Sequence, residues 1–269
     1  MNFYNKDIKR IYYDIMNEKG EQGVLVFLNG VMASTSSWIN QYEEFKKIGY
    51  KIVLHDFVGQ LRSDKFEGVY SFKKHAEDVR ELLNHIGVSR PHLIGTSYGG
   101  EVAMKYATMY PDEVNSITVI DSVSEVDDKM VRCVEEWIDL AQMYDGEQFF
   151  YGMMPSIYGY NYIKNNKDVL HIRAKAMNKI PKEYFDGQIG LYKTFIEDVN
   201  MTKELEKITC PALIVCGKED TLKPVKFSEI IAENIKNSKL KIIPDCGHVT
   251  IFEQPQELNR LIKDFLSNI

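Results

Sequence analysis

The sequence predicts an α/β protein with a mostly parallel, twisted sheet of about eight strands, helices on both faces and one long helical insertion. Short apolar runs alternate with helical patterns along most of the chain. The runs are continuous, which is typical of strands buried on both faces, and strand–helix alternation implies right-handed crossovers between parallel strands. The alternation is interrupted once, over residues 122–199. These features predict one sheet domain that carries an insertion.

The strands are predicted from β-rich apolar runs bounded by turn residues. The N-terminal segment differs, because residues 9–15 partly alternate between apolar and polar side chains. Together with residues 3–4 they predict an antiparallel hairpin at the edge of the sheet. The expected parallel strands are residues 24–28, 51–55, 92–95, 116–120, 212–216 and 239–243.

Helices are predicted where apolar residues recur with a period of about 3.6. Over residues 72–86, Ser71 is the expected N-cap and Gly87 the end signal. A shorter pattern precedes Gly49, and Pro255 opens the last helix. The apolar positions of these two helices are Trp38, Tyr42 and Phe45 in the first and Leu258, Leu261, Ile262, Phe265 and Ile269 in the last.

Residues 122–199 contain no convincing strand run and are predicted to form several helices joined by Gly, Pro and Asn. We therefore expect a core domain of residues 1–121 and 200–269 and a helical cap, or lid, of residues 122–199. Aromatic and methionine residues gather at 149–155 and 158–162. They fit either an apolar acyl pocket or simple packing of the cap onto the sheet domain.

The cap also carries a locally basic stretch in an acidic protein. A solvated helix face is the favoured interpretation, and docking of an acidic carrier protein or a phosphate-bearing thioester is the alternative. The residues concerned are Lys164, Lys167, Arg173, Lys175, Lys179 and Lys182.

Charge and composition exclude several classes. The 33 Lys and Arg against 39 Asp and Glu give a net charge of −6 without a block of like charge, so neither nucleic acid nor an anionic membrane is an expected partner. The N-terminus lacks an apolar signal segment and no apolar run approaches about eighteen residues, which predicts a cytoplasmic protein without a membrane span. Neither a disulfide nor a metal site is expected, because the cysteines lack the spacing. They are Cys133, Cys210, Cys216 and Cys246.

The sharpest local feature is Gly-Thr-Ser-Tyr-Gly-Gly at residues 95–100, between a predicted strand and a predicted helix. The pattern G-x-S-x-G is that of a nucleophile elbow, in which the serine occupies a strained turn and flanking glycines avoid Cβ clashes. Ser97 is therefore the candidate nucleophile. The N-terminus of the following helix would direct N–H groups at developing negative charge.

A serine nucleophile needs a base within hydrogen-bond reach. Of the six histidines, five lie within strand, helix or insertion patterns, and His248 alone lies in a loop just after the last predicted strand. Catalytic groups of open parallel sheets gather at such strand ends. His248 is therefore the candidate base.

The base must in turn be oriented by a carboxylate. Asp220, in the loop after the strand at 212–216, is the favoured acid. Asp121 also follows a predicted strand and is the rival, and Glu219 is a weaker one. The chain order of serine, Asp220 and histidine is the order expected for this fold class.

These motifs resemble those of the α/β-hydrolase superfamily, in its capped serine esterase and lipase-like branch. The resemblance spans nearly the whole chain and rests on the elbow at 95–100, the acid loop at 216–220, the base loop at 246–248 and an oxyanion loop at 29–34. It implies an α/β-hydrolase fold with a cap after the strand that follows the elbow, where residues 122–199 lie.

The resemblance also implies an oxyanion hole made by the backbone N–H groups of Val31 and Tyr98. Two positions depart from the family pattern. Asn29 replaces the usual histidine of a His-Gly pair, but asparagine can still hydrogen-bond the loop backbone. Leu61 stands where a further glycine is common, which makes the loop at 56–63 harder to predict.

The activity expected from this set is hydrolysis of a carboxylic ester of a small or medium acyl substrate, through a Ser-His-Asp triad and an acyl-enzyme, with no metal or organic cofactor required. An acyl thioester or a C–C bond is the alternative target of the same triad, because one fold hosts many chemistries. A non-catalytic ligand receptor on the same scaffold is the alternative from another class. The expected partner is thus a small-molecule ester or thioester.

Overall fold

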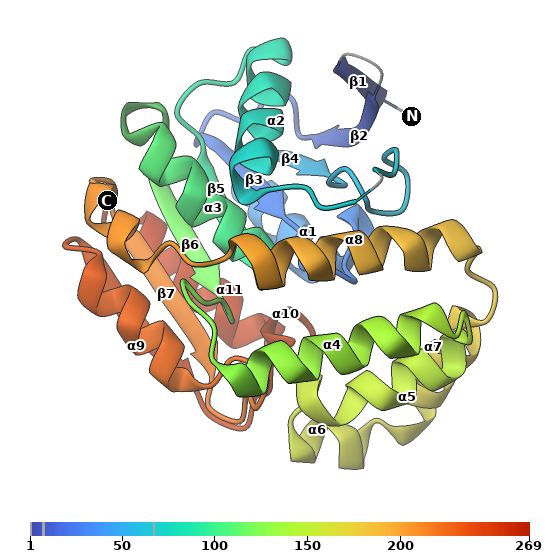
Figure 1. The fold of residues 1–269 in the computed structure, drawn as a ribbon. Helices are drawn as coiled ribbons and strands as arrows, with labels where there is room; N and C mark the ends of the chain where they lie inside the picture. The colour runs from blue at the N-terminus through green and yellow to red at the C-terminus, as the bar shows by residue number, and fades with distance from the viewer. Residues whose placement is uncertain (1, 7–8, 67) are drawn as a thin grey trace.

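The structure, a computed structural model, describes residues 2–6, 9–66 and 68–269. Within these ranges it contains one eight-stranded sheet in the order β1-β2-β4-β3-β5-β6-β7-β8 (Figure 1). The predicted fold class is confirmed. The strands are β1 (Asn2–Lys6), β2 (Lys9–Met16), β3 (Val24–Leu28), β4 (Lys51–His55), β5 (His92–Thr96), β6 (Ser116–Ile120), β7 (Ala212–Gly217) and β8 (Ser238–Ile243).

The N-terminal hairpin forms as expected at one edge of the sheet. β1 pairs antiparallel with β2, with Phe3 opposite Tyr12, and β2 pairs antiparallel with β4. All other neighbouring strands pair parallel. The carboxyl ends of the parallel strands β3 to β8 therefore lie on the same side of the sheet, where the loops that follow them can converge.

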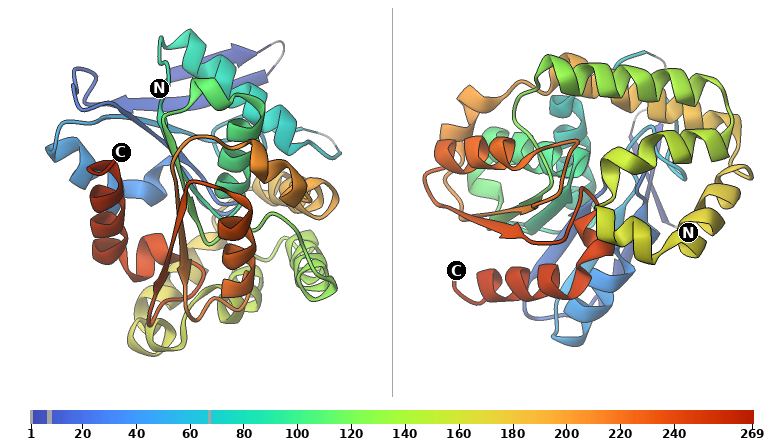
Figure 2. Two further views of the ribbon diagram at one scale, coloured as in Figure 1. Left: turned by 90° about the vertical axis from the view of Figure 1, so that its left-hand side faces the viewer. Right: turned by 90° about the horizontal axis from the view of Figure 1, so that it is seen from below.

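Helices cover both faces of the sheet (Figure 2). Side chains alternate along β3, so that Leu25 and Phe27 pack on one face and Val26 and Leu28 on the other. This double burial explains why the run at 24–28 is continuously apolar. The first face is covered by α1 (Ile39–Lys47) and α11 (Pro255–Leu266), with the short α10 (Thr250–Glu253) beside them, and the second by α2 (Phe72–His85), α3 (Tyr98–Met109) and α9 (Val225–Asn234).

β8 differs from the expectation of a strand buried on both faces. It lies at the sheet edge with β7 as its one neighbour, and Ile243 is its one buried residue. Lys239 and Lys241 keep this edge charged, which discourages pairing with another chain.

The helix end signals act as predicted for α2, where the Ser71 hydroxyl accepts a hydrogen bond from the Lys74 N–H at 3.0 Å. Gly87, beyond the helix end, has a φ of +67°. α11 begins at Pro255 but ends at Leu266, so the predicted stripe was wrong at Ile269, which lies beyond the helix and is 49% exposed. Leu266 is buried instead.

Residues 122–199, all of them described, contain five helices and no strand. Figure 1 shows these helices gathered at one end of the molecule, with α4 and α8 side by side. They are α4 (Asp128–Gln142), α5 (Gly146–Ile157), α6 (Tyr160–Asn165), α7 (Lys167–Met177) and α8 (Lys182–Asp198). Short 3-10 turns occur at Thr35–Trp38, Pro111–Glu113 and Thr202–Lys207. Among the described residues, no helix has the length and apolarity that a membrane crossing requires.

The two isoleucines predicted for one stripe provide a test of the core. Ile262→Ala, at a fully buried site on α11, is expected to lower the free energy of unfolding by about 2–5 kcal/mol, because it removes packed methyl groups and leaves a cavity. Ile269→Ala is the matched control and should change it by less than about 0.5 kcal/mol. Urea denaturation measures both, and equal effects would contradict the packing described.

Candidate active site

Ser97 occupies the turn between β5 and α3 with a φ of +51° and a ψ of −121°. Glycines surround it because there is no room for side chains. A Cβ on Gly95 would lie 2.2 Å from the Gly99 carbonyl oxygen, and one on Gly99 would lie 2.0 Å from that of Leu28. The predicted nucleophile elbow thus has the strained backbone and close packing that its pattern requires.

His248 lies within hydrogen-bond distance of the other two residues predicted to form a triad. His248 Nε2 is 3.0 Å from Ser97 Oγ, and His248 Nδ1 is 2.7 Å from Asp220 Oδ2. The other Asp220 oxygen accepts the backbone N–H groups of Leu222 and Lys223, at 2.9 and 2.8 Å. Asp220 is therefore fixed by its own loop with one oxygen left for the imidazole.

The two rival acids bond to backbone N–H groups and not to the imidazole. Asp121 Oδ1 accepts the Gly217 N–H at 2.9 Å, and its Oδ2 accepts the Thr250 N–H at 3.3 Å. Asp121 thus ties the acid loop to the base loop. Glu219 accepts the backbone N–H of Tyr160 in the insertion. Of the three carboxylates, Asp220 is the one bonded to the imidazole.

Burial and nearby charges shift the pKa values of His248 and Asp121. Burial alone would lower the pKa of His248, but the Asp220 carboxylate at Nδ1, helped by Asp121, raises it above its ordinary 6.5. Burial and the nearby Asp220 carboxylate raise the pKa of Asp121 to about 7. Carboxylates that share a buried site cannot both ionise easily, which is why the proton affinity of Asp121 rises beside Asp220.

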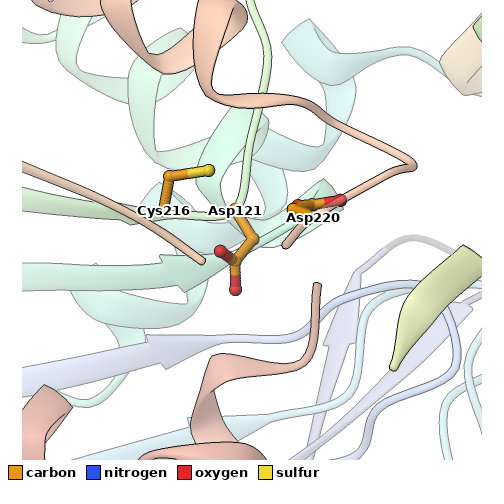
Figure 3. A group of neighbouring side chains, drawn as sticks. All are labelled: Asp121, Cys216 and Asp220. Atoms are coloured by element: carbon orange, nitrogen blue, oxygen red, sulfur yellow. The ribbon is translucent and has the colours of Figure 1, made fainter. Parts of the chain in front are cut away.

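Asp121, Cys216 and Asp220 offer donor atoms within 4.8 Å of one another (Figure 3). The carboxylate oxygens already accept the hydrogen bonds given above, and the Cys216 thiol donates to the Gly217 carbonyl at 3.3 Å. Burial raises the pKa of the Cys216 thiol, which keeps it protonated and a poor ligand. We therefore describe this cluster as hydrogen-bonded acids at strand ends and assign no metal to it.

Asn29 was expected to hydrogen-bond the backbone of its own loop, but its side chain bonds to the end of β4 and to other side chains. Its side-chain amide donates to the His55 carbonyl at 2.9 Å and to the Gln60 side-chain oxygen at 3.1 Å, and its own oxygen accepts from the Trp38 indole at 2.8 Å. The side chain is fully buried. Asn29 therefore holds the loops after β3 and β4 together.

Gln60 orients the loop that was expected to supply an oxyanion donor. Its Nε2 donates to the Gly30 carbonyl at 2.7 Å and to the Val31 carbonyl at 3.1 Å. Because the Gly30 carbonyl and the Val31 N–H belong to one trans peptide unit, this N–H points away from Gln60. The Tyr98 N–H is the first of α3 and so has no acceptor within its helix. Val31 and Tyr98 line the same cavity as Ser97.

That cavity has a volume of about 450 Å³ and opens over the serine and the histidine. Its lining is largely apolar and includes Trp137, Phe150 and Met153 from the insertion. Of the basic stretch, Arg173 reaches the cavity, donates to the Tyr158 hydroxyl and lies over the Phe252 ring, while the other five residues are exposed.

Three site residues were missed from the sequence. Gln60 lies in the loop whose conformation was hardest to predict. Lys223 and Glu101 lie beside the serine, with Lys223 Nζ at 3.1 Å from Ser97 Oγ and at 2.7 Å from Glu101 Oε1. No local pattern marks Glu101 or Lys223, and the available signal was only that Glu101 lies in the helix after the serine turn and Lys223 in the loop that carries Asp220.

The strand order and the strand-to-helix serine turn place the molecule among α/β proteins of the hydrolase type. Residues 23–255 match the family model described as the alpha/beta hydrolase fold. The chain therefore belongs to the α/β hydrolase family, as the sequence resemblance implied.

Similar proteins of named activity include hydrolases with different substrates. Monoacylglycerol lipase abhd6-A of Xenopus laevis is 24% identical, over 96% of this chain and 79% of its own length. The 2-hydroxy-6-oxo-6-phenylhexa-2,4-dienoate hydrolase of Comamonas testosteroni is also 24% identical, over 93% of this chain and 90% of its own. Among solved structures, MGS-M2, an alpha/beta hydrolase enzyme from a Medee basin deep-sea metagenome library, has a TM-score of 0.93 and 27% identity, covering 99% of this chain and 97% of its own.

The raised pKa of Asp121 makes stability depend on pH. Its carboxyl binds a proton more readily folded than unfolded, so its contribution is fully present below the ordinary pKa of 3.8 and is lost as the pH rises through about 7. Asp121→Asn cannot ionise. The melting temperature of Asp121→Asn minus that of the wild type should therefore increase as the pH is raised from 5 to 8.

The exposed Asp112→Asn variant is the control for this measurement. Its melting temperature should stay parallel to that of the wild type over the same range. Parallel curves for Asp121→Asn as well would contradict a raised pKa at this carboxyl.

Proposed function

We propose that this chain is a serine hydrolase that cleaves a carboxylic ester of a small or medium acyl substrate. The observation that carries the proposal is the continuous set of contacts from Asp220 through His248 to Ser97, which ends in a largely apolar cavity. A volume of about 450 Å³ is within the range of small-molecule sites, and its apolar lining suits an acyl chain. The named lipase among the relatives supports an ester substrate.

In the proposed reaction, His248 removes the Ser97 proton as the oxygen attacks the ester carbonyl. The Val31 and Tyr98 N–H groups would hold the oxyanion. Protonated His248 then gives the proton to the leaving alcohol, and water repeats the cycle on the acyl-enzyme. Asp220 keeps Nδ1 protonated, so that Nε2 is free to accept a proton.

Residues 122–199 are proposed to act as a cap on the core formed by 1–121 and 200–269. Support comes from the insertion side chains in the cavity lining and from backbone contacts to the base loop. The backbone N–H of His248 donates to the Ile157 carbonyl at 2.9 Å. We infer that the cap sets the length of acyl chain accepted.

Ester hydrolysis by Ser97 is tested with p-nitrophenyl esters whose acyl chain is lengthened stepwise. The wild type should turn over the shorter chains, and Ser97→Ala should lose at least about a thousandfold in kcat, because the attacking oxygen is removed. Ser36→Ala, an exposed serine at the cavity mouth, is the matched control. Equal rates for the wild type and Ser97→Ala would refute the proposal.

The choice between the two buried aspartates is tested by paired substitutions. Asp220→Asn should lower kcat by about ten-thousandfold, because the histidine loses the partner that fixes its tautomer. Asp121→Asn should retain activity within about tenfold, because Asp121 does not bond to the imidazole and the amide oxygen can still accept one of its two backbone N–H groups. The reverse ranking would make Asp121 the orienting acid.

The raised pKa of His248 predicts the acid side of the pH profile. The base must be neutral to accept the serine proton, so kcat/KM should rise as the pH passes through a value above 6.5 and then level off. In Asp121→Asn a carboxyl that raises this pKa is gone, so the rise should move to lower pH. A profile that is flat from pH 5 upwards would contradict His248 as the base.

A further inference from the structure

Lys223 places a cation against the proposed nucleophile. Its side chain is almost completely buried, with 3% of the residue exposed, and its Nζ lies 3.1 Å from Ser97 Oγ. The same Nζ donates to Glu101 Oε1 at 2.7 Å. A buried lysine within hydrogen-bond distance of the attacking oxygen is not part of a Ser-His-Asp triad, so its presence calls for a separate explanation.

Three parts of the fold hold this ammonium in place. The Lys223 backbone N–H donates to Asp220 Oδ1, so the acid loop fixes its Cα. Glu101, on α3, is itself fixed by accepting the Val123 N–H at 3.0 Å. The Phe195 ring on α8 lies 4.6 Å from Nζ. The lysine is therefore preorganised and does not depend on a flexible side chain finding its partner.

Glu101 is what allows a charge to exist at this depth. An ammonium without a partner in a buried site tends to lose its proton, whereas a carboxylate in contact favours the charged form. Burial raises the pKa of Glu101, and Lys223 opposes that rise. Buried pairs of this kind add little to stability compared with apolar residues, so stability alone gives a weak reason for the pair.

The hydrogen-bond donors and acceptors around Ser97 Oγ leave room for a lysine ammonium. With His248 Nδ1 donating to Asp220, Nε2 is an acceptor and takes the serine hydrogen. One lone pair on Oγ accepts from Lys223 and the other remains free. The hydroxyl can therefore contact the base and the ammonium at the same time without competition for a proton.

We propose that Lys223 is a further catalytic residue, whose ammonium stabilises negative charge on Ser97 Oγ while Glu101 holds the ammonium in place. This inference rests on the proposed function. During attack the Oγ–H proton passes to His248 Nε2 as the bond from Oγ to the acyl carbon forms. During deacylation that bond breaks, its electron pair returns to Oγ, and Oγ recovers a proton from His248. Lys223 keeps its own proton throughout.

Lys223→Met tests the role in catalysis. We expect kcat for an uncharged p-nitrophenyl ester to fall about 10- to 100-fold, the usual weight of a hydrogen bond to a charged group, with little change in KM. Charged groups that act on His248 include the carboxylates of Asp220, Asp121, Glu101 and Glu253 and the Lys223 ammonium. Without the ammonium the pKa of His248 should rise, so the acid limb of kcat/KM should move to higher pH.

Glu101→Gln gives an independent readout. The amide can still accept the Val123 N–H, but the ammonium loses its carboxylate and should give up its proton more easily. We therefore expect kcat to fall toward that of Lys223→Met, with a loss that is larger at alkaline than at neutral pH. The double variant Glu101→Gln/Lys223→Met removes both charges together, so it should fold even if a lone buried carboxylate destabilises Lys223→Met.

A second lysine–glutamate pair, whose lysine lies on α3, provides the control. Lys105, on α3, pairs with Glu204 at 2.9 Å away from the cavity. Lys105→Met should leave kcat, the pH profile and the labelling rate unchanged. The second-order rate at which an uncharged fluorophosphonate labels Ser97 reports on the oxygen directly, and it should be slower in both variants that lack Lys223.

The outcomes separate this inference from the proposed function. If Lys223→Met and the double variant keep the activity and the Ser97 labelling rate of the wild type, only the role of Lys223 is overturned. An effect confined to the KM of esters that carry a carboxylate would also overturn it, and would make Lys223 a substrate-binding group. A wild type without Ser97-dependent turnover or labelling would overturn the proposed function, and this inference with it.

Discussion

The backbone at Ser97 has a positive φ that non-glycine residues rarely adopt and that costs of order 1–3 kcal/mol. The surrounding structure over-determines it. The Ser97 N–H donates to the Ile120 carbonyl at 2.8 Å, and its carbonyl accepts from the Gly100 N–H and the Ser122 hydroxyl. Because α3 must then start against β3, the loop after β3 is brought to the serine, where a Cβ on Gly30 would lie 3.5 Å from Ser97 Cβ.

The ends of the next two parallel strands supply acids with different tasks. Asp121 follows β6 at a φ of +49° and accepts N–H groups from the loops that carry Asp220 and His248. Asp220 follows β7 and faces the imidazole. Burial makes two full negative charges costly so close together, and the raised pKa of Asp121 relieves that cost. Asp121 can therefore serve as scaffold while Asp220 accepts the imidazole N–H.

The sequence was sufficient for features that depend on local pattern. Strand runs, the α2 caps, the serine turn and the histidine loop each have short-range signatures, and the structure places those elements where they were expected. Interactions between distant segments were not accessible. Glu101 and Lys223 are 122 positions apart, and neither has a motif that marks it as buried and paired. Ile269 was misassigned because periodicity does not show where the last turn of a helix stops.

The base loop and the insertion share backbone hydrogen bonds, which links two regions with different proposed roles. Besides the His248 bond to Ile157, Glu253 Oε2 accepts the Gly247 N–H at 3.0 Å and the Gly159 N–H at 3.1 Å. A side chain on Gly247 would meet the Gly159 nitrogen at 2.4 Å, so the two segments are in direct contact. Displacing the end of α5 would therefore break a hydrogen bond to the histidine itself. A substrate that packs against α5 and α8 would act on the position of the base as well as on the shape of the cavity, which ties substrate fit to catalytic geometry.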